Sequence, residues 1–234
     1  MTMMRFLLTA LIFAVAAAAQ TSSEAADPAP DGTTAAMPLK QWDDNHILGV
    51  VPNYATVDEP QKTYEPLTVG GKLLIATHDS FDPFNWAITG LYAAVYQKEN
   101  EYAFGQGAAG YAQRYAVTFA DATISTYFSE GLFPVMLHED PRFFRLGEGT
   151  KLHRIGYALT RVLVTRTDAG AWRFNNSEIE GNLLAAGISN FYYPQVNRGV
   201  GTTFVKFGIG VVSDAGFNVL KEFWPDMRQK VFGR

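Results

Sequence analysis

The sequence predicts an all-α protein: a compact bundle of about six amphipathic to apolar helices that follows a signal peptide and a disordered linker. Two observations support this fold class. From residue 67 onwards, apolar residues recur three and four positions apart, as on one face of a helix. Strand-like alternation stands out only in FVKFGIGVV (204–212), where a helical stripe of apolar residues also continues to Phe223. Because that stripe is too long for a typical strand, we expect helix there too.

The first 19 residues have the pattern of a secretory signal peptide. Arg5 precedes an apolar run over 6–15, and alanines at 17–19 form a small-residue cleavage site. The run is short for a bilayer span, which needs about 20 residues, so an uncleaved anchor is the less favoured alternative. The chain has no cysteine, which excludes lipoprotein attachment, disulfides and cysteine-ligated metals.

Three further segments follow. Residues 20–40 are mostly Ser, Thr, Ala, Pro, Asp and Gly. Such a segment buries too little apolar surface to offset its ordering entropy, so we expect a disordered linker. Residues 41–66 are interrupted by three prolines and should be extended and turn-rich. Residues 67–234 form the α-helical domain.

Start and stop signals place the helices. Asp82 followed by Pro83 is a helix start, with Asp at the N-cap and Pro at the first helical position. Ser177 with Glu180 fits a capping box. The expected helical ranges are 84–99, 108–138 with a break near Gly131 to Pro134, 152–164, 177–193 and 202–223.

Composition favours a membrane-associated or oligomeric protein over a free monomer. Charged residues are 18%, against about 25% in ordinary soluble domains, and aromatic residues reach 14%. A net charge of −4 offers no basic face for nucleic acid. Small residues recur at helical spacing, which suits either a membrane bundle or crowded crossings in a soluble core. They are Ala112/Ala116/Ala120 and Gly208/Val212/Gly216.

The segment HEDPRFFR (138–145) is the densest polar cluster, and the sequence predicts neither a metal nor a cofactor there. Consecutive helical positions point about 100° apart, so His138, Glu139 and Asp140 cannot all bind one metal ion from a regular helix. HExxH is absent, and so are the GxSxG and SxxK nucleophile motifs.

A structural corner is the favoured interpretation. Pro141 disfavours helix at Asp140, so a helix should end there and a short new turn should begin, capped by Asp140. Arg142 and Arg145 should pair with Glu139 or with carboxylates elsewhere. This helix–turn–helix corner comprises His138, Glu139, Asp140, Arg142 and Arg145.

The functional alternative is a small hydrolase or lyase. It requires His138 and Glu139 to meet His78 and Asp79 in space as a general acid–base pair. Single charges in apolar helices also indicate a functional site or a structural ion network, because they are costly to bury unpaired. Those charges are Asp121, Glu130, Arg161, Arg166, Lys206 and Asp214.

At HEDPRFF, LTRVLVTRTD and EFWPD the sequence resembles a family of exported bacterial proteins with no assigned function. The resemblance covers most of residues 67–226 and implies an envelope location, without an activity or catalytic residue. We therefore expect a non-enzymatic exported protein of the periplasm or cell envelope, with outer-membrane association included. Its expected partner is membrane lipid or an envelope protein, and oligomerisation is compatible. An outer-membrane β-barrel is the weakest alternative, because it needs alternating strands throughout.

Overall fold

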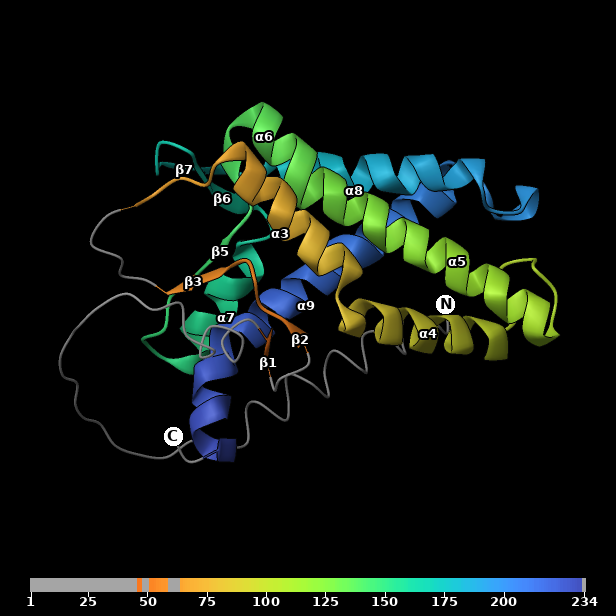
Figure 1. Cartoon of the computed structure of the whole chain (residues 1–234), viewed down its shortest axis with the longest axis horizontal. Coiled ribbons are helices and arrows are strands. Elements are labelled where there is room, and N and C mark those ends of the chain that lie inside the picture. Colours follow the sequence, from red (N-terminus) through yellow and green to blue (C-terminus); the bar gives the residue numbers. More distant parts are fainter. Residues whose placement is uncertain (1–45, 48–50, 59–63, 233–234) are drawn as a thin grey trace.

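The computed structural model describes residues 46–47, 51–58 and 64–232 (Figure 1). The predicted signal peptide (1–19) and linker (20–40) lie outside these described residues. The predicted all-α fold is confirmed, because long helices build the domain and the described strands are short. The helices are α3 (Val69–Phe81), α4 (Pro83–Lys98), α5 (Gly107–Thr126), η1 (Tyr127–Leu132), α6 (Phe133–Leu137), α7 (Lys151–Thr160), α8 (Asn176–Ile188), η2 (Ser189–Phe191), η3 (Gln195–Asn197) and α9 (Val200–Phe232).

Side-chain caps fix where several helices begin. The predicted start at Asp82 is confirmed, since its Oδ1 accepts from the Phe84 amide at 2.8 Å and Pro83 is the first residue of α4. Thr68 caps α3 in the same manner, accepting from the Gly71 amide at 3.1 Å. These bonds satisfy amides that have no partner inside the helix.

The predicted capping box at Ser177 is wrong. Asn175 is the N-cap of α8, and its Oδ1 accepts from the Glu178 amide at 3.1 Å. Ser177 lies in the first turn instead, where its amide and hydroxyl donate to Glu139. Glu139, which is far away in sequence, therefore accepts the hydrogen bonds at the start of α8, where the predicted capping box used Ser177 and Glu180.

The predicted break near Gly131 to Pro134 is a change of helix type. Residues Tyr127–Leu132 form a π-helical segment that joins α5 to α6 without a bend into a loop. Proline has no amide hydrogen to donate, and π-helical segments absorb such a defect while the chain remains helical.

Short strands close one end of the bundle. They are β1 (His46–Ile47), β2 (Val51–Pro52), β3 (Thr56–Asp58), β4 (Glu139–Asp140), β5 (Phe143–Arg145), β6 (Val164–Thr167) and β7 (Trp172–Phe174). Strands β4, β6 and β7 form an antiparallel sheet, β3 pairs with β5 in parallel, and β1 pairs with β2.

This pairing overturns the expected helix–turn–helix corner. His138 ends α6 in the left-handed conformation with φ 55°, and the next residues enter β4 and β5 instead of a new helical turn. Asp140 still accepts from the Arg142 amide at 3.0 Å. The chain is extended because Asp140 lies opposite Arg166 and Phe143 opposite Thr56, and both partners are remote in sequence.

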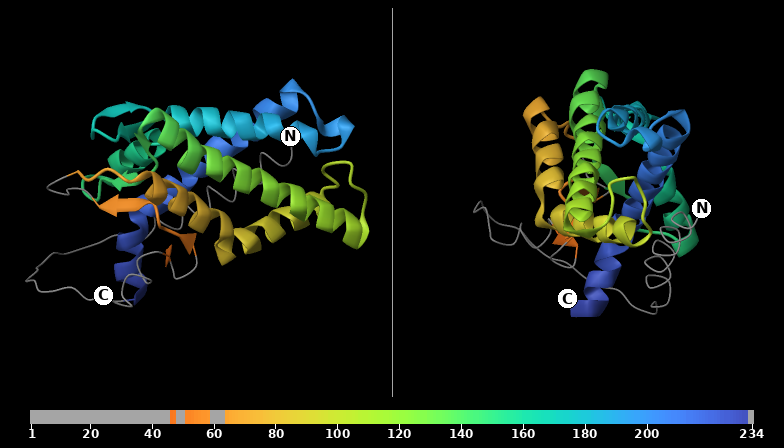
Figure 2. Two further views of the ribbon diagram at one scale, coloured as in Figure 1. Left: turned by 45° about the horizontal axis from the view of Figure 1, so that its top comes forward. Right: turned by 90° about the vertical axis from the view of Figure 1, so that its right-hand side faces the viewer.

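The long helices pack around a shared interior (Figure 2). Helices α3, α5 and α8 all contact η1, while α9 crosses the bundle and packs on α7 and α8. An apolar core of Phe143, Ala158, Val219 and Phe223 joins β5, α7 and α9.

Three members of the predicted small-residue stripes lie outside helix contacts, although Gly216 is buried. Ala112 and Ala116 are exposed, and a methyl group on Gly208 would meet nothing within 4 Å. A close approach to backbone lies at Gly181 of α8, where an added Cβ would lie 2.7 Å from the Ser129 backbone nitrogen.

Candidate functional site

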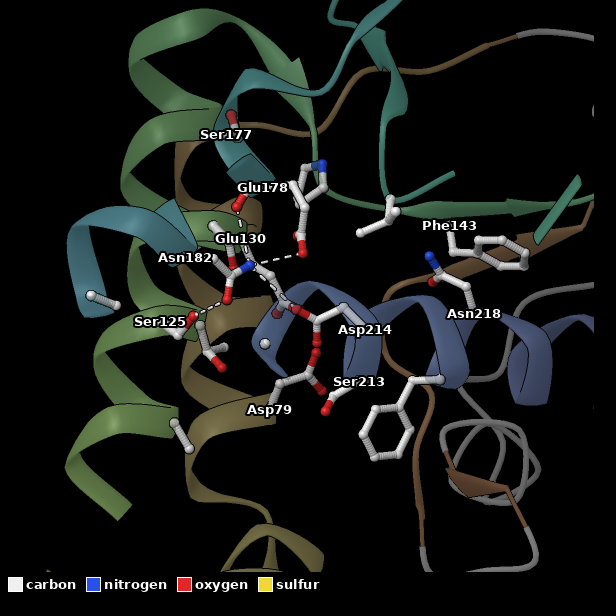
Figure 3. Close-up of a pocket in the computed structure, with 18 of the residues that line it drawn as sticks. Asp79, Ser125, Glu130, Phe143, Ser177, Glu178, Asn182, Ser213, Asp214 and Asn218 are labelled. Carbon is white, nitrogen blue, oxygen red and sulfur yellow. Dashed lines mark hydrogen bonds between the residues drawn. The ribbon is translucent and has the colours of Figure 1, made fainter. Parts of the chain in front are cut away.

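A cavity of about 370 Å³ lies inside the bundle. Four helical elements place acidic side chains in its wall: Asp79 from α3, Glu130 from η1, Glu178 from α8 and Asp214 from α9. Figure 3 shows these four side chains pointing toward one another. Lys221 of α9 also lines the cavity.

Helical spacing brings these groups to the interior. Asp79 lies next to Ser80 and three residues after Ala76, two buried residues on the inner face of α3. Glu178 and Asn182 are four residues apart and so share one face of α8.

Asp79 and Glu130 are neighbouring carboxyl groups that a proton on one of them would join by a hydrogen bond. One oxygen of each, Asp79 Oδ1 and Glu130 Oε2, is shielded from solvent and accepts no hydrogen bond from a donor among the described residues. Burial, strengthened by the charge of Asp79 and by their hydrogen bond, raises the pKa of Glu130 well above its usual range. Two carboxylates at such a place cannot both ionise cheaply, so we infer that Glu130 holds a proton shared with Asp79.

Glu178 and Asp214 form a second pair of the same kind. Burial and the charge and hydrogen bond of Asp214 raise the pKa of Glu178 well above its usual range. Asn182 connects the two, because its Nδ2 donates to Glu178 Oε1 at 2.8 Å and to Asp214 Oδ2 at 3.3 Å. Ser125 Oγ in turn donates to Asn182 Oδ1 at 2.7 Å. By the same reasoning we infer that Glu178 and Asp214 share one proton within this network from α5, α8 and α9.

Lys221 partly balances the charge of both pairs. Its positive charge lowers the pKa of Asp79, Glu130, Glu178 and Asp214, although burial outweighs this effect at each of them. With one proton shared in each pair, two negative charges face one lysine.

A second ionic centre lies on the same cavity wall. Asp121 accepts from the hydroxyl of Tyr193 at 2.7 Å, from Tyr192 and from Lys206 Nζ at 3.0 Å. The Lys206 amine also lies 3.0 Å from the centre of the Tyr193 ring. Burial lowers the pKa of Lys206 to about 8, although the nearby Asp121 acts in the opposite direction. Near neutral pH this amine can therefore exist in both protonation states.

The structure does not assemble the predicted acid–base set as one site. The side chain of His138 is 82% exposed, with Nδ1 3.7 Å from Asp168 Oδ2. His78 makes an edge contact with the ring of Tyr54. Among the described residues, Asp79 and Glu139 line the cavity but neither histidine does.

Glu139 is instead a structural anchor. It is fully buried and accepts from the Ser177 amide at 2.8 Å, from Ser177 Oγ at 2.6 Å and from Asn176 Nδ2 at 3.0 Å. Arg173 Nε lies 3.1 Å away. Of the two predicted options for Arg142, pairing with Glu139 or with another carboxylate, the first is not made, because Glu139 caps α8 and pairs with Arg173.

Asp140 is the partner of Arg142. Arg142 Nη2 donates to Asp140 Oδ2 at 2.6 Å, and the hydroxyl of Tyr64 donates to the same oxygen at 2.7 Å. Arg145 lies on β5 in register with Asp58. The polar corner thus ties the strands to the bundle by charge-assisted hydrogen bonds, which are stronger than neutral ones.

Sequence reasoning singled out part of the cavity. Glu130, Asp214, Asp121 and Lys206 were visible as single charges in apolar helices, whereas Glu178 was not. An acidic residue in the first turn of a helix is favoured by the helix dipole, and that ordinary role concealed Glu178. Among the described residues, no group of three or more His, Cys, Asp or Glu side chains is placed to hold a metal ion.

Comparisons with protein-family models, with curated proteins and with solved structures give no match for this chain.

Proposed function

We propose that this protein is a non-enzymatic, membrane-associated helical domain of the cell envelope that contacts lipid through its apolar exterior. The observation that carries this proposal is the distribution of polarity, with large apolar side chains outside and charged ones inside. Exposed apolar residues include Val69, Leu74 and Phe81 on α3, Trp86 and Leu91 on α4, Leu183 and Leu184 on α8, and Phe204, Val205, Val212 and Phe217 on α9.

The interior is unusually charged for a water-soluble domain. Lys72, Arg114, Glu139, Asp140 and Glu222 are all almost fully buried. Such residues are rarely buried unless paired, and exposed apolar residues in soluble proteins are usually scattered singly. Contact with lipid removes the cost of exposing these apolar side chains, because they are then no longer in water.

Helix α9 supports the same proposal. Its segment Val200–Lys230 is long and apolar enough to cross a membrane, and only 6% of its most apolar window is buried inside the protein. A core helix of a soluble protein would be mostly buried. However, α9 packs on α7 and α8, and its Lys206 and Asp214 line the cavity. We therefore propose that α9 lies along the membrane surface, as amphipathic helices do, and does not cross the bilayer.

Fractionation tests this proposal. The full chain, expressed in a bacterium, should sediment with membranes after detergent-free lysis and should be released by mild detergent. The proposed export predicts that it is found in the envelope fraction after spheroplasts are prepared. A protein recovered wholly in a soluble fraction would show that membrane association is wrong.

Ligand binding in the cavity is a second candidate function. Tyr92, Tyr96 and Tyr102 line it together with the carboxyl pairs, and ligand sites usually combine apolar walls with a few polar groups. Native mass spectrometry of the purified protein should then detect a copurifying small molecule. A substitution that fills the cavity, Ser125→Phe, should displace that molecule, while the exposed change Ala112→Phe should not.

A further inference from the structure

The segment that joins α8 to α9 lies at one end of the bundle and carries highly exposed apolar side chains. We define the apolar tip as residues 189–200, which comprise η2, η3 and the first residue of α9. Figures 1 and 2 show it projecting beyond α8, far from α7. Phe191 is 81% exposed, Val196 79% and Val200 74%.

Side-chain hydrogen bonds hold the backbone of the apolar tip in place despite this exposure. Asn190 holds both of its ends, since its Nδ2 donates to Thr203 Oγ1 at 2.8 Å and its Oδ1 accepts from the Gly199 amide at 2.7 Å. Asn197 Oδ1 accepts from the Ala103 amide at 2.8 Å, which joins the tip to the loop after α4. Polar groups thus bond inward while Phe191, Val196 and Val200 face outward.

The apolar tip itself carries no acidic residue. Residues 181–213 contain no Asp or Glu, and their two charged residues are Arg198 and Lys206. Lys206 is bound to Asp121 inside the bundle. Arg198 is exposed, although its Nε donates to the Tyr193 carbonyl at 2.6 Å. The adjoining loop carries Glu99 and Glu101, so apolar contact, not net charge, must supply most of the attraction.

The apolar surface also continues from the tip onto two helices. Leu183 and Leu184 lead into it along α8, and Phe204 and Val205 lead away along α9. A surface spread over two helices and a projecting loop suits a fluid bilayer better than a single protein groove. A bilayer accepts any apolar projection, whereas a protein partner must match its shape.

We propose that the apolar tip inserts into the bilayer, with Phe191, Val196 and Val200 among the acyl chains and Arg198 at the level of the phosphates. This inference rests on the proposed membrane association and names the part of the surface that enters the membrane. Arginine near such an interface extends its charged end to the headgroups while its stem remains in apolar surroundings.

Fluorescence can locate the inserted residues directly, because the chain has no native cysteine. The full chain would carry one cysteine, from Phe191→Cys or Val196→Cys, labelled with an environment-sensitive fluorophore. Leu152→Cys on α7 is the matched control, since Leu152 is also 81% exposed. With phosphatidylcholine vesicles, labels at 191 and 196 should shift to the blue and be protected from iodide, while the label at 152 should not.

Binding measurements supply the second arm. The double variant Phe191→Asp/Val196→Asp should bind the vesicles at least tenfold more weakly, since burying one large apolar side chain is worth about a factor of ten or more. Leu152→Asp should bind like the unaltered chain. Both changes are at exposed sites, and circular dichroism checks that the helices are retained.

The outcomes separate this inference from the proposed function. If the unaltered chain binds vesicles and the double variant binds equally well, the tip does not insert but membrane association stands. If the unaltered chain binds no vesicles, with or without phosphatidylglycerol, both proposals fail. A blue shift at 191 that needs no vesicles and grows with protein concentration would identify a second copy as the occupant and overturn insertion.

Discussion

Replacing Glu178 by Gln should change how the stability of this protein depends on pH. Glu178 holds the proton that it shares with Asp214, because burial and that neighbour raise its pKa well above the usual 4.5. The glutamine amide keeps the shape of the side chain. It can donate to Asp214 and accept from Asn182 through its carbonyl, as Glu178 Oε1 does now at 2.8 Å.

The size of the effect follows from counting protons. Above pH 4.5 the unfolded chain releases a proton that Glu178 retains in the folded state, so the free energy of unfolding falls as the pH rises. Each retained proton contributes a slope of about 1.4 kcal/mol per pH unit. Glu130 retains a second proton for the same reason, so both pairs together give at most about 2.8 kcal/mol per pH unit.

Urea unfolding between pH 5 and pH 7, a window of about two units, measures this slope. Glu178→Gln should reduce it by about 1.4 kcal/mol per pH unit while leaving the contribution of Glu130. Glu180→Gln is the matched control, because Glu180 is an exposed carboxylate on the same helix, and it should leave the slope unchanged. Asp82 does not contribute to the slope in this window. Hydrogen bonds outweigh burial and lower its pKa from 3.8, so it changes the free energy of unfolding only at lower pH.

The reasoning also predicts the sign at neutral pH. Glu178→Gln should be at least as stable as the unaltered protein at pH 7, because it no longer has to retain a proton there. A variant with the unaltered slope would refute the shared-proton assignment. So would a large loss of stability at pH 7 together with a normal slope, since Glu178 would then be an ionised partner that the fold requires.

Three further predictions concern helix packing, the polar corner and the loop after α4, and urea unfolding measures the change in stability for each. Gly181→Ala should cost about 1–3 kcal/mol or more, because the added methyl group would overlap backbone atoms at 2.7 Å. Gly187→Ala on the same helix has open space and should stabilise by up to about 1 kcal/mol. Equal effects of these two changes would contradict the close contact of α8 with η1. Asp140→Ala should cost about 1–3 kcal/mol, because it leaves the half-buried guanidinium of Arg142 without its partner. His138→Ala, at an exposed helix end, should cost less than about 1 kcal/mol. Arg114→Met should cost about 3–5 kcal/mol, because this fully buried guanidinium donates to four backbone carbonyls. The same change should increase proteolysis of the loop after α4. If the loop stays as resistant to protease as in the unaltered protein, Arg114 does not hold it in place.

Local signals in the sequence were sufficient for the helices and for several of their ends. The Asp82 cap and the irregularity before Pro134 depend on residues within one or two turns, so a short window contains their cause. The helical identity of 204–212 was also decided locally, by a stripe too long for a strand. The single charges at Glu130 and Asp214 indicated that each needs a partner when buried, but the sequence did not identify the partner.

Tertiary structure decided the rest, because the partners are distant along the chain. Asp140 is extended since it pairs with β6, some 26 residues later, and Ser177 is bound by Glu139, 38 residues earlier. The carboxyl pairs join α3 to η1 and α8 to α9, so no periodicity within one helix could reveal them. The spacing of residues within a helix determines which of its faces is polar. The pKa of a buried carboxyl group depends instead on the groups that neighbouring helices place beside it.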